Sequence, residues 1–348
     1  MLQLGDAVRQ RLEQRPCRWL VTGAAGFIGS HLVEALLGLG QTVVGLDNCS
    51  GAALAKLDRM RHRVGEDAFG RLTIVNGDIR DLQCCRQAMD GVNLVLHQAA
   101  LVSVPASLAD PVACHANNVT GFCMVLEAAR QAGVRRVVYA SSSAVYGDDS
   151  VLAKDETMAG QPRTPYALSK VVNEHYAATY ARCYNQDVVG LRYFNVYGPR
   201  QTATGAYAAV IPLWFAALFQ GQEPVIYGDG SATRDFCFVQ DVVRANILAA
   251  LLENVALAGE VVNVGSGRSV SLLELYAALS ETVYALYPDL PRVSPRHLPP
   301  RAGDLQHSLA DMTKTQQTLG FMPEVSLRQG LAVSARAYFG EEGTTGNV

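Results

Sequence analysis

Tyr166 and Lys170 stand four residues apart in the stretch TPYALSK, residues 164–170. Thr164 can cap a helix and Pro165 fits a first helical turn, so we expect a helix to begin here and to carry both side chains on one face. A free tyrosine titrates at about 10, and a nearby ammonium favours its phenolate. The pair predicts a base, Tyr166, whose pKa is tuned by Lys170, although the spacing alone also suits a surface pair.

Three serines, Ser141, Ser142 and Ser143, end an apolar run that begins near residue 135. In open α/β folds, ligands bind where parallel strands end at their carboxyl side. A serine hydroxyl there can hydrogen-bond a substrate oxygen and help to pass its proton to a phenolate. The order of a glycine turn, an acidic strand end, a serine strand end and then the Tyr/Lys helix favours catalysis over a surface pair.

Gly23, Gly26 and Gly29 follow the first apolar run with the spacing G-x-x-G-x-x-G. Such glycines allow a tight turn and close approach to a pyrophosphate at a helix N-terminus, although a plain turn is the alternative reading. Asp47, at the end of the second run, can accept hydrogen bonds from ribose hydroxyls and would repel a 2′-phosphate, which favours NAD over NADP. The other expected cofactor contacts are Phe27, Ile28, Asn48, Asp78, Ile79, Ala99, Ala100 and Tyr193, together with Tyr166 and Lys170.

Short β-branched runs alternate with stretches of helical period over the first two hundred residues. The runs are 19–23, 42–47, 72–78, 93–100, 135–142 and 187–198. Strands that are apolar on both faces belong in a parallel sheet covered by helices. The pattern predicts an α/β fold with a doubly wound parallel (Rossmann) sheet. The expected division is a helical extension over 1–16, a dinucleotide-binding domain over 17–200 to which a strand at 260–265 returns, a smaller mixed α/β substrate lobe over 201–340, and a tail over 341–348.

The composition is that of a soluble globular protein, with 49% hydrophobic and 18% charged residues and a net charge of −3. This charge is far from the basic character of nucleic-acid binders, so we expect no nucleic-acid partner. The eight cysteines are scattered without zinc spacing, which predicts no metal site and a reduced, cytoplasmic chain. No run of about 18 apolar residues and no export signal occurs, so no membrane association is expected.

The chain resembles the extended short-chain dehydrogenase/reductase family over residues 17–340. The matching motifs are TGAAGFIG (22–29), LDN (46–48), HQAA (97–100), SSSAVYGD (141–148), YALSK (166–170) and RYFNVYGPRQ (192–201). The resemblance implies that Tyr166 is the base and Lys170 its partner and a nicotinamide-ribose ligand. It also implies a catalytic serine hydroxyl, with Ser142 first and Ser143 next, and an NAD that stays bound and is regenerated in each turnover.

The residues before Tyr146 separate the reactions known in this family. Sugar-nucleotide dehydratases carry an Asp-Glu pair there, and UDP-glucuronate decarboxylases carry a glutamate, whereas this chain has Ser143 and Ala144. Dehydration therefore lacks its acid and base. What remains is epimerisation at C4, which needs only a reversible hydride transfer and a proton shuttle.

The second half of the chain supports a nucleotide-sugar substrate by the same resemblance. Asn195 would bridge to the diphosphate or sugar, Arg234 and Arg301 would clamp the diphosphate, and Asp304 would meet the ribose. Guanidinium groups match phosphate oxygens well, although each arginine could also be an ordinary surface charge. The expected substrate contacts also include Val210, Tyr227, Ser142, Ser143 and Tyr166.

Within the family the chain is most similar to bacterial UDP-N-acetylglucosamine 4-epimerases, which supply precursors of surface polysaccharides. The shared stretches are ALVSVPAS (100–107), RQTATGAYAAVIP (200–212) and GDLQHSLAD (303–311). The resemblance implies that Ser308 borders the sugar C2, that Gln201 and Ala209 line the same pocket, and that Ser103 contacts the sugar. Val102 stands where that group has glycine and adds volume near the pocket. The alternatives are UDP-glucose or UDP-glucuronate 4-epimerisation, or a non-catalytic NAD-binding protein.

Two helical stretches, 111–133 and 164–185, carry apolar residues on more than one face. The resemblance implies a homodimer in which these helices pack against those of a second copy. Burial within one chain is the alternative.

Overall fold

A seven-stranded parallel sheet forms the centre of the molecule. The computed structural model describes residues 4–49, 53–147, 151–158, 160–202, 209–252, 257–300 and 306–342. The strands run in the order β12-β7-β5-β4-β1-β2-β3, which confirms the predicted doubly wound fold. Their bounds are β1 Arg18–Thr22, β2 Thr42–Asp47, β3 Leu72–Asn76, β4 Leu94–His97, β5 Arg136–Ser142, β7 Val188–Tyr193 and β12 Val261–Val264.

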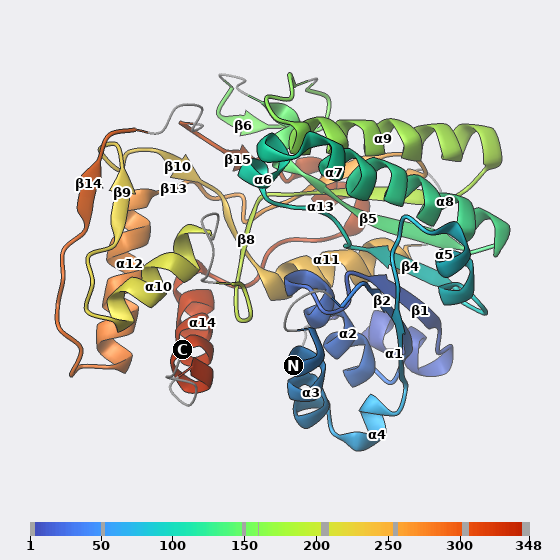
Figure 1. Cartoon of the computed structure of the whole chain (residues 1–348), viewed down its shortest axis with the longest axis horizontal. Coiled ribbons are helices and arrows are strands. Elements are labelled where there is room, and N and C mark those ends of the chain that lie inside the picture. Colours follow the sequence, from blue (N-terminus) through green and yellow to red (C-terminus); the bar gives the residue numbers. More distant parts are fainter. Residues whose placement is uncertain are drawn as a thin grey trace.

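Helices cover both faces of this sheet, as Figure 1 shows. On one face α2 (Phe27–Gly38) and α11 (Val239–Leu251) share a core with the strands, and on the other α5 (Leu82–Ala88), α8 (Gly121–Gln131) and α9 (Pro165–Tyr184) enclose a second core. The strands are therefore buried on both sides, as their continuous apolar sequences require. The remaining helices of this half are α1 (Asp6–Gln14), α3 (Ala53–Val64), α4 (Glu66–Phe69), α6 (Val104–Ala109), α7 (Pro111–His115), a π-helical turn (Ala116–Thr120) and a 3₁₀ turn (Ser143–Tyr146).

Helix α9 begins where the sequence predicted it. The Thr164 hydroxyl accepts a hydrogen bond from the Ala167 amide at 3.1 Å, and Pro165 occupies the first turn. The helix ends at Asn185, whose φ of 51° is the left-handed conformation that asparagine tolerates at a helix end. The cap fixes the first turn of α9, and with it Tyr166, next to the sheet edge.

A smaller lobe lies beside the sheet, on the left of Figure 1. Its third core is built on Trp214, Phe215 and Leu275. The lobe contains α10 (Val210–Phe219), α12 (Leu272–Leu286), α14 (Leu327–Glu342) and the parallel pair β9 (Val225–Tyr227) and β14 (Arg296–Leu298). Three short pairs join it to the sheet: β8 (Asn195–Tyr197) with β11 (Phe236–Phe238), β10 (Thr233–Arg234) with β13 (Val270–Ser271), and β6 (Ala153–Lys154) with β15 (Leu309–Ala310).

Two segments from the second half of the chain lie in the sheet layer rather than in the lobe. β12 pairs with β7, and α11 shares the core of α2, β4 and β5. Leu319, the last residue of helix α13 (Thr313–Leu319), and Phe321 just after it belong to the same core. None of the helices in the described parts of the chain is both long and apolar enough to cross a membrane.

Candidate functional site

Two cavities lie at the carboxyl edge of the sheet and meet each other. The first, of 760 Å³, lies over the ends of the parallel strands, and the second, of 1380 Å³, lies in the lobe. Asn195, Val196, Gln201 and Ala209 line both. A ligand in the first cavity can therefore touch a ligand in the second at these residues.

The glycine turn between β1 and α2 shapes the first cavity. Gly23 has a φ of 68°, and a Cβ there would lie 2.9 Å from the Ala99 nitrogen. A Cβ on Gly29 would lie only 2.0 Å from the Gly23 carbonyl oxygen. Backbone therefore packs on backbone, and the N-terminus of α2 faces the cavity as an anion cradle.

The carboxylate of Asp47 is fixed at the end of β2. Its oxygens accept hydrogen bonds from the Ala25 amide at 3.0 Å and the Cys49 amide at 2.9 Å. This anchors the acid on the wall of the cavity, one strand from the glycine turn, as recognition of an adenosine ribose requires. The residues present thus fit a dinucleotide.

All the expected cofactor contacts line this first cavity: Gly23, Gly26, Phe27, Ile28, Gly29, Asp47, Asn48, Asp78, Ile79, Ala99, Ala100, Tyr166, Lys170 and Tyr193. Asn117 lines it too, and the sequence analysis missed it. Asn117 stands in the π-helical turn, with its side-chain amide donating to the Ala113 carbonyl at 2.8 Å. The available signal was the pair Asn117-Asn118 inside a helical stretch, because asparagine is unfavourable in helix interiors and π-helical turns gather at functional sites.

The predicted catalytic residues meet at the wall of the first cavity. Tyr166, Lys170 and Ser142 line it, and the Ser142 hydroxyl lies near enough to the Tyr166 phenol to lower its pKa. Ser143 begins the 3₁₀ turn and is not among the described residues that line either cavity. The structure therefore pairs the phenol with Ser142 rather than with Ser143.

The amine of the lysine is held by the backbone of β5. Lys170 Nζ donates to the Ala140 carbonyl at 2.8 Å and lies 5.8 Å from the centroid of the Tyr166 ring. Removal from water is the largest influence on the phenol and raises the pKa of Tyr166, while the hydrogen bond to Ser142 lowers it. Burial also lowers the pKa of Lys170 to about 8. Burial rather than Lys170 is therefore the main influence on the pKa of Tyr166.

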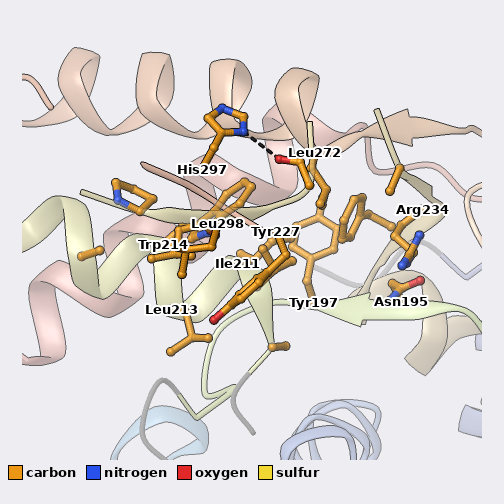
Figure 2. A pocket seen from close by; sticks show the side chains of 18 of the residues that line it. Asn195, Tyr197, Ile211, Leu213, Trp214, Tyr227, Arg234, Leu272, His297 and Leu298 are labelled. Atoms are coloured by element: carbon orange, nitrogen blue, oxygen red, sulfur yellow. Dashed lines mark hydrogen bonds between the residues drawn. The ribbon is translucent and has the colours of Figure 1, made fainter. Parts of the chain in front are cut away.

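The second cavity is lined by polar and by large apolar side chains, and Figure 2 shows how they are distributed. Asn195 and Arg234 lie side by side at the end that adjoins the first cavity. Trp214, Tyr227 and Leu298 line the other end. The expected contacts Gln201, Ala209 and Val210 line this cavity as well. The arrangement suits a phosphate group held by a guanidinium and a flat ring placed among apolar side chains.

Other expected sugar contacts lie elsewhere. Ser103 caps α6, where its hydroxyl accepts from the Ala106 amide, and Ser308 is buried; neither is among the described residues lining the cavities. Val102 lines the first cavity, with 68% of its surface exposed. It therefore stands at the mouth of the first cavity. Arg301 and Asp304 lie outside the described residues.

No group of three metal-ligating side chains occurs among the residues that the structure describes. The chemical groups at the first cavity include the Tyr166 phenol, the Ser142 hydroxyl and the Lys170 ammonium, and they lie in the same cavity as the glycine turn.

Comparison with known proteins gives a consistent result. The NAD dependent epimerase/dehydratase family matches residues 19–265. The chain is 40% identical over 316 residues to a UDP-glucose 4-epimerase of Mycolicibacterium smegmatis, covering 90% of this chain and 96% of that one. It is 30% identical to a UDP-glucuronate 4-epimerase of Thermodesulfobacterium geofontis, with 90% and 93% covered. Among solved structures, a UDP-N-acetylglucosamine 4-epimerase of Methanobrevibacter ruminantium bound to UDP-N-acetylmuramic acid superposes with a TM-score of 0.84 at 34% identity, over 94% of this chain and 99% of that one.

Proposed function

Because the chain belongs to the NAD dependent epimerase/dehydratase family and uses NAD as its cofactor, we propose that it is a UDP-hexose 4-epimerase that interconverts UDP-N-acetylglucosamine and UDP-N-acetylgalactosamine. The observation that carries the proposal is that the first cavity, which Tyr166 lines, joins the second cavity at Asn195. A UDP-sugar with its diphosphate at Asn195 and Arg234 would present its hexose to the Tyr166–Ser142 pair. The cellular role that follows is supply of a precursor for surface polysaccharides.

Proton movement falls to the chain's own residues. The Ser142 hydroxyl takes the proton of the sugar O4 and passes its own to the Tyr166 phenolate. NAD, when bound, supplies the hydride acceptor and a positive charge beside the phenol. Asn195 and Arg234 hold the diphosphate while the hexose rotates to present its opposite face. Tyr166 then returns the proton by way of Ser142. The sugar is neither oxidised nor reduced overall.

The lining of the cavities bears on the choice of hexose. Glucuronate would need an additional cation or hydroxyl near C6, and among the described lining residues Lys170 and Arg234 are the lysine and arginine side chains. Lys170 bonds to the β5 backbone, and the proposal assigns Arg234 to the diphosphate. Ala209, at the junction of the cavities, is small and leaves room for an acetamido group. These features favour the N-acetylhexosamine over the uronic acid.

The test is a product assay with the purified protein and no added NAD. UDP-N-acetylglucosamine, UDP-glucose and UDP-glucuronate are supplied separately, and each 4-epimer is measured by chromatography. We expect UDP-N-acetylgalactosamine to form with the highest kcat/KM. Faster epimerisation of UDP-glucose or UDP-glucuronate would contradict the acetyl preference, and absence of all three products would contradict the activity itself.

Replacing the serine that contacts the phenol should separate the two candidate hydroxyls. Ser142→Ala is expected to lower kcat about a hundredfold, because the proton relay loses one member. Ser143→Ala should keep most of the turnover, since its side chain stands outside the cavity lining. Steady-state rates of the two variants check this, and a larger loss in Ser143→Ala would reassign the relay.

We also propose that the chain forms a homodimer through the surface of α7 and α9. Val112 on α7 and Leu168 on α9 are 76% and 51% exposed, and Tyr176 on α9 is exposed as well. The two helices pack on each other, so these exposed apolar side chains lie on neighbouring helices that a second copy could cover. Light scattering should give the mass of a dimer for the native chain and that of a monomer for Leu168→Glu. A monomeric native chain would overturn the proposal.

A further inference from the structure

Helix α9 carries a second charged side chain, Glu174, on the face of Tyr166 and Lys170. Glu174 lies one helical turn beyond Lys170. The two side chains bind consecutive residues at the end of β5: Lys170 Nζ donates to the Ala140 carbonyl at 2.8 Å, and the Ser141 hydroxyl donates to Glu174 Oε1 at 2.5 Å. The helix is thus fastened to the strand at two successive residues, directly before Ser142.

The carboxylate of Glu174 is held by a bidentate ion pair. Arg192 on β7 donates from Nε to Oε1 at 2.9 Å and from Nη2 to Oε2 at 2.8 Å. The side chains of Arg192 and Glu174 are only 8% and 14% exposed. The guanidinium also lies 4.8 Å over the ring of Tyr146 and donates to the Glu156 carbonyl. This arrangement fixes the position of the carboxylate between three elements.

We propose that Glu174 is a positioning residue of the catalytic group: it holds the end of β5 against α9 so that the Ser142 hydroxyl faces Tyr166, and it keeps a negative charge beside the Lys170 ammonium. The consequence for turnover rests on the proposed epimerase function, whereas the effect on Lys170 does not.

The charges around Lys170 set the direction of the effect. Burial lowers the pKa of Lys170, and the carboxylate of Glu174 and the thiol of Cys114 on α7 raise it. His97 on β4 also faces the ammonium; burial and this neighbouring charge lower the pKa of His97 to about 3, so the imidazole is neutral. Without the charge of Glu174, the lowering of the Lys170 pKa by burial would be offset less. Lys170 would then lose its proton at a lower pH.

The groups that face Glu174 itself are few. Arg192 on β7 and Lys170 on α9 are the cations, and Tyr139 on β5 is a buried phenol whose pKa is raised by burial first and by Glu174 second. Tyr139 is therefore neutral over the range in which Lys170 titrates. A change at position 174 should reach Lys170 without a second titrating group between them.

The pKa of Lys170 can be measured directly by NMR, because the chain has four lysines: Lys56, Lys154, Lys170 and Lys314. Lysine labelled with ¹³C at Cε gives one NMR signal for each, and Lys170→Met assigns the signal of interest. We expect Glu174→Gln to lower the pKa of Lys170 by about one unit. The alkaline limb of the kcat/KM profile should move to lower pH by the same amount.

Two control variants distinguish the loss of the Glu174 charge from the loss of a hydrogen bond and from a general loss of stability. Ser141→Ala removes a hydrogen bond but leaves the carboxylate, so Lys170 should titrate as in the native chain. Asp187→Asn breaks another buried ion pair, with Arg136 at 2.5 Å, at the opposite end of β5. It should lower stability comparably and leave both Lys170 and the pH profile unmoved.

An unchanged Lys170 titration in Glu174→Gln, or an equal shift in Asp187→Asn, would overturn the inference. If Glu174→Gln does not fold, the double variant Glu174→Gln/Arg192→Met leaves no unpaired buried charge. It should still lower the pKa of Lys170, because the carboxylate acts on this lysine more strongly than the guanidinium does; an unchanged value there would equally overturn the inference. If Glu174→Gln shifts the titration of Lys170 but the native chain epimerises no UDP-hexose, the proposed function alone would be contradicted.

Discussion

Tyr166→Phe is expected to lower kcat about a thousandfold while NAD remains bound, since general base catalysis contributes on this scale. The substitution removes one oxygen, whose pKa the nearby Ser142 hydroxyl lowers, and leaves the ring beside Lys170. Turnover is measured by product formation, and retained cofactor by its absorbance after the protein is denatured. Tyr184→Phe is the matched control, because Tyr184 stands at the far end of the same helix with 53% of its surface exposed.

Turnover that survives in Tyr166→Phe would assign the base to another group. A native chain that binds NAD and shows no turnover with any UDP-hexose would instead support the non-catalytic alternative. The two failures are distinct, because the first concerns one residue and the second the whole reaction.

Gly29→Ala is expected to weaken NAD binding roughly a hundredfold. The added Cβ would lie 2.0 Å from the Gly23 carbonyl oxygen and 2.7 Å from the Gly23 carbonyl carbon. Both are backbone atoms of the turn, so the turn itself must move, at a cost of about 3 kcal/mol. Titration of cofactor-free protein with NAD measures the change.

The control for this prediction lies on the same helix. Gly38, at the end of α2, has open space where a Cβ would stand, and alanine is the better helix former. Gly38→Ala should therefore bind NAD as the native chain does and unfold at an equal or higher temperature. Equal NAD affinity in Gly29→Ala and Gly38→Ala would contradict the interpretation of the turn as a cofactor cradle.

The central sheet could be predicted from the sequence because its strands are continuous apolar runs. The run over residues 135–142 became β5, Arg136–Ser142, and the cap at Thr164 marked the start of α9. Local signals of this kind depend on a few neighbouring residues and do not need the rest of the chain. The cofactor cradle follows from them, because the carboxyl ends of parallel strands all meet at one edge.

Contacts between distant segments could not be predicted in this way. The family resemblance ranked Ser142 before Ser143, but local sequence signals did not separate them: Ser142 ends β5 and lines the cavity, whereas Ser143 begins the 3₁₀ turn. The bond from Lys170 to Ala140 depends on how closely α9 approaches β5. Ser103 was expected at the sugar, but its hydroxyl caps α6, which is the commoner use of a serine at a helix start.

Chain order misled the sequence analysis in one further place. Helix α11 follows the first short strands of the lobe in the sequence, yet it packs on α2 and the sheet. Its buried face carries Val242, Val243 and Ala245, and such residues fit either core equally well. Asn117 was missed for a different reason: its place at the cavity depends on the π-helical turn.

The most direct test of the account is an epimerisation with a deuterium label at C4 of the UDP-hexose, in ordinary water and without added NAD. The account predicts that the 4-epimer carries the deuterium at C4, because that hydrogen leaves as a hydride and returns to the same carbon without meeting solvent. Loss of the label to water in the product would show that C4 is inverted by proton exchange, and would contradict the central claim.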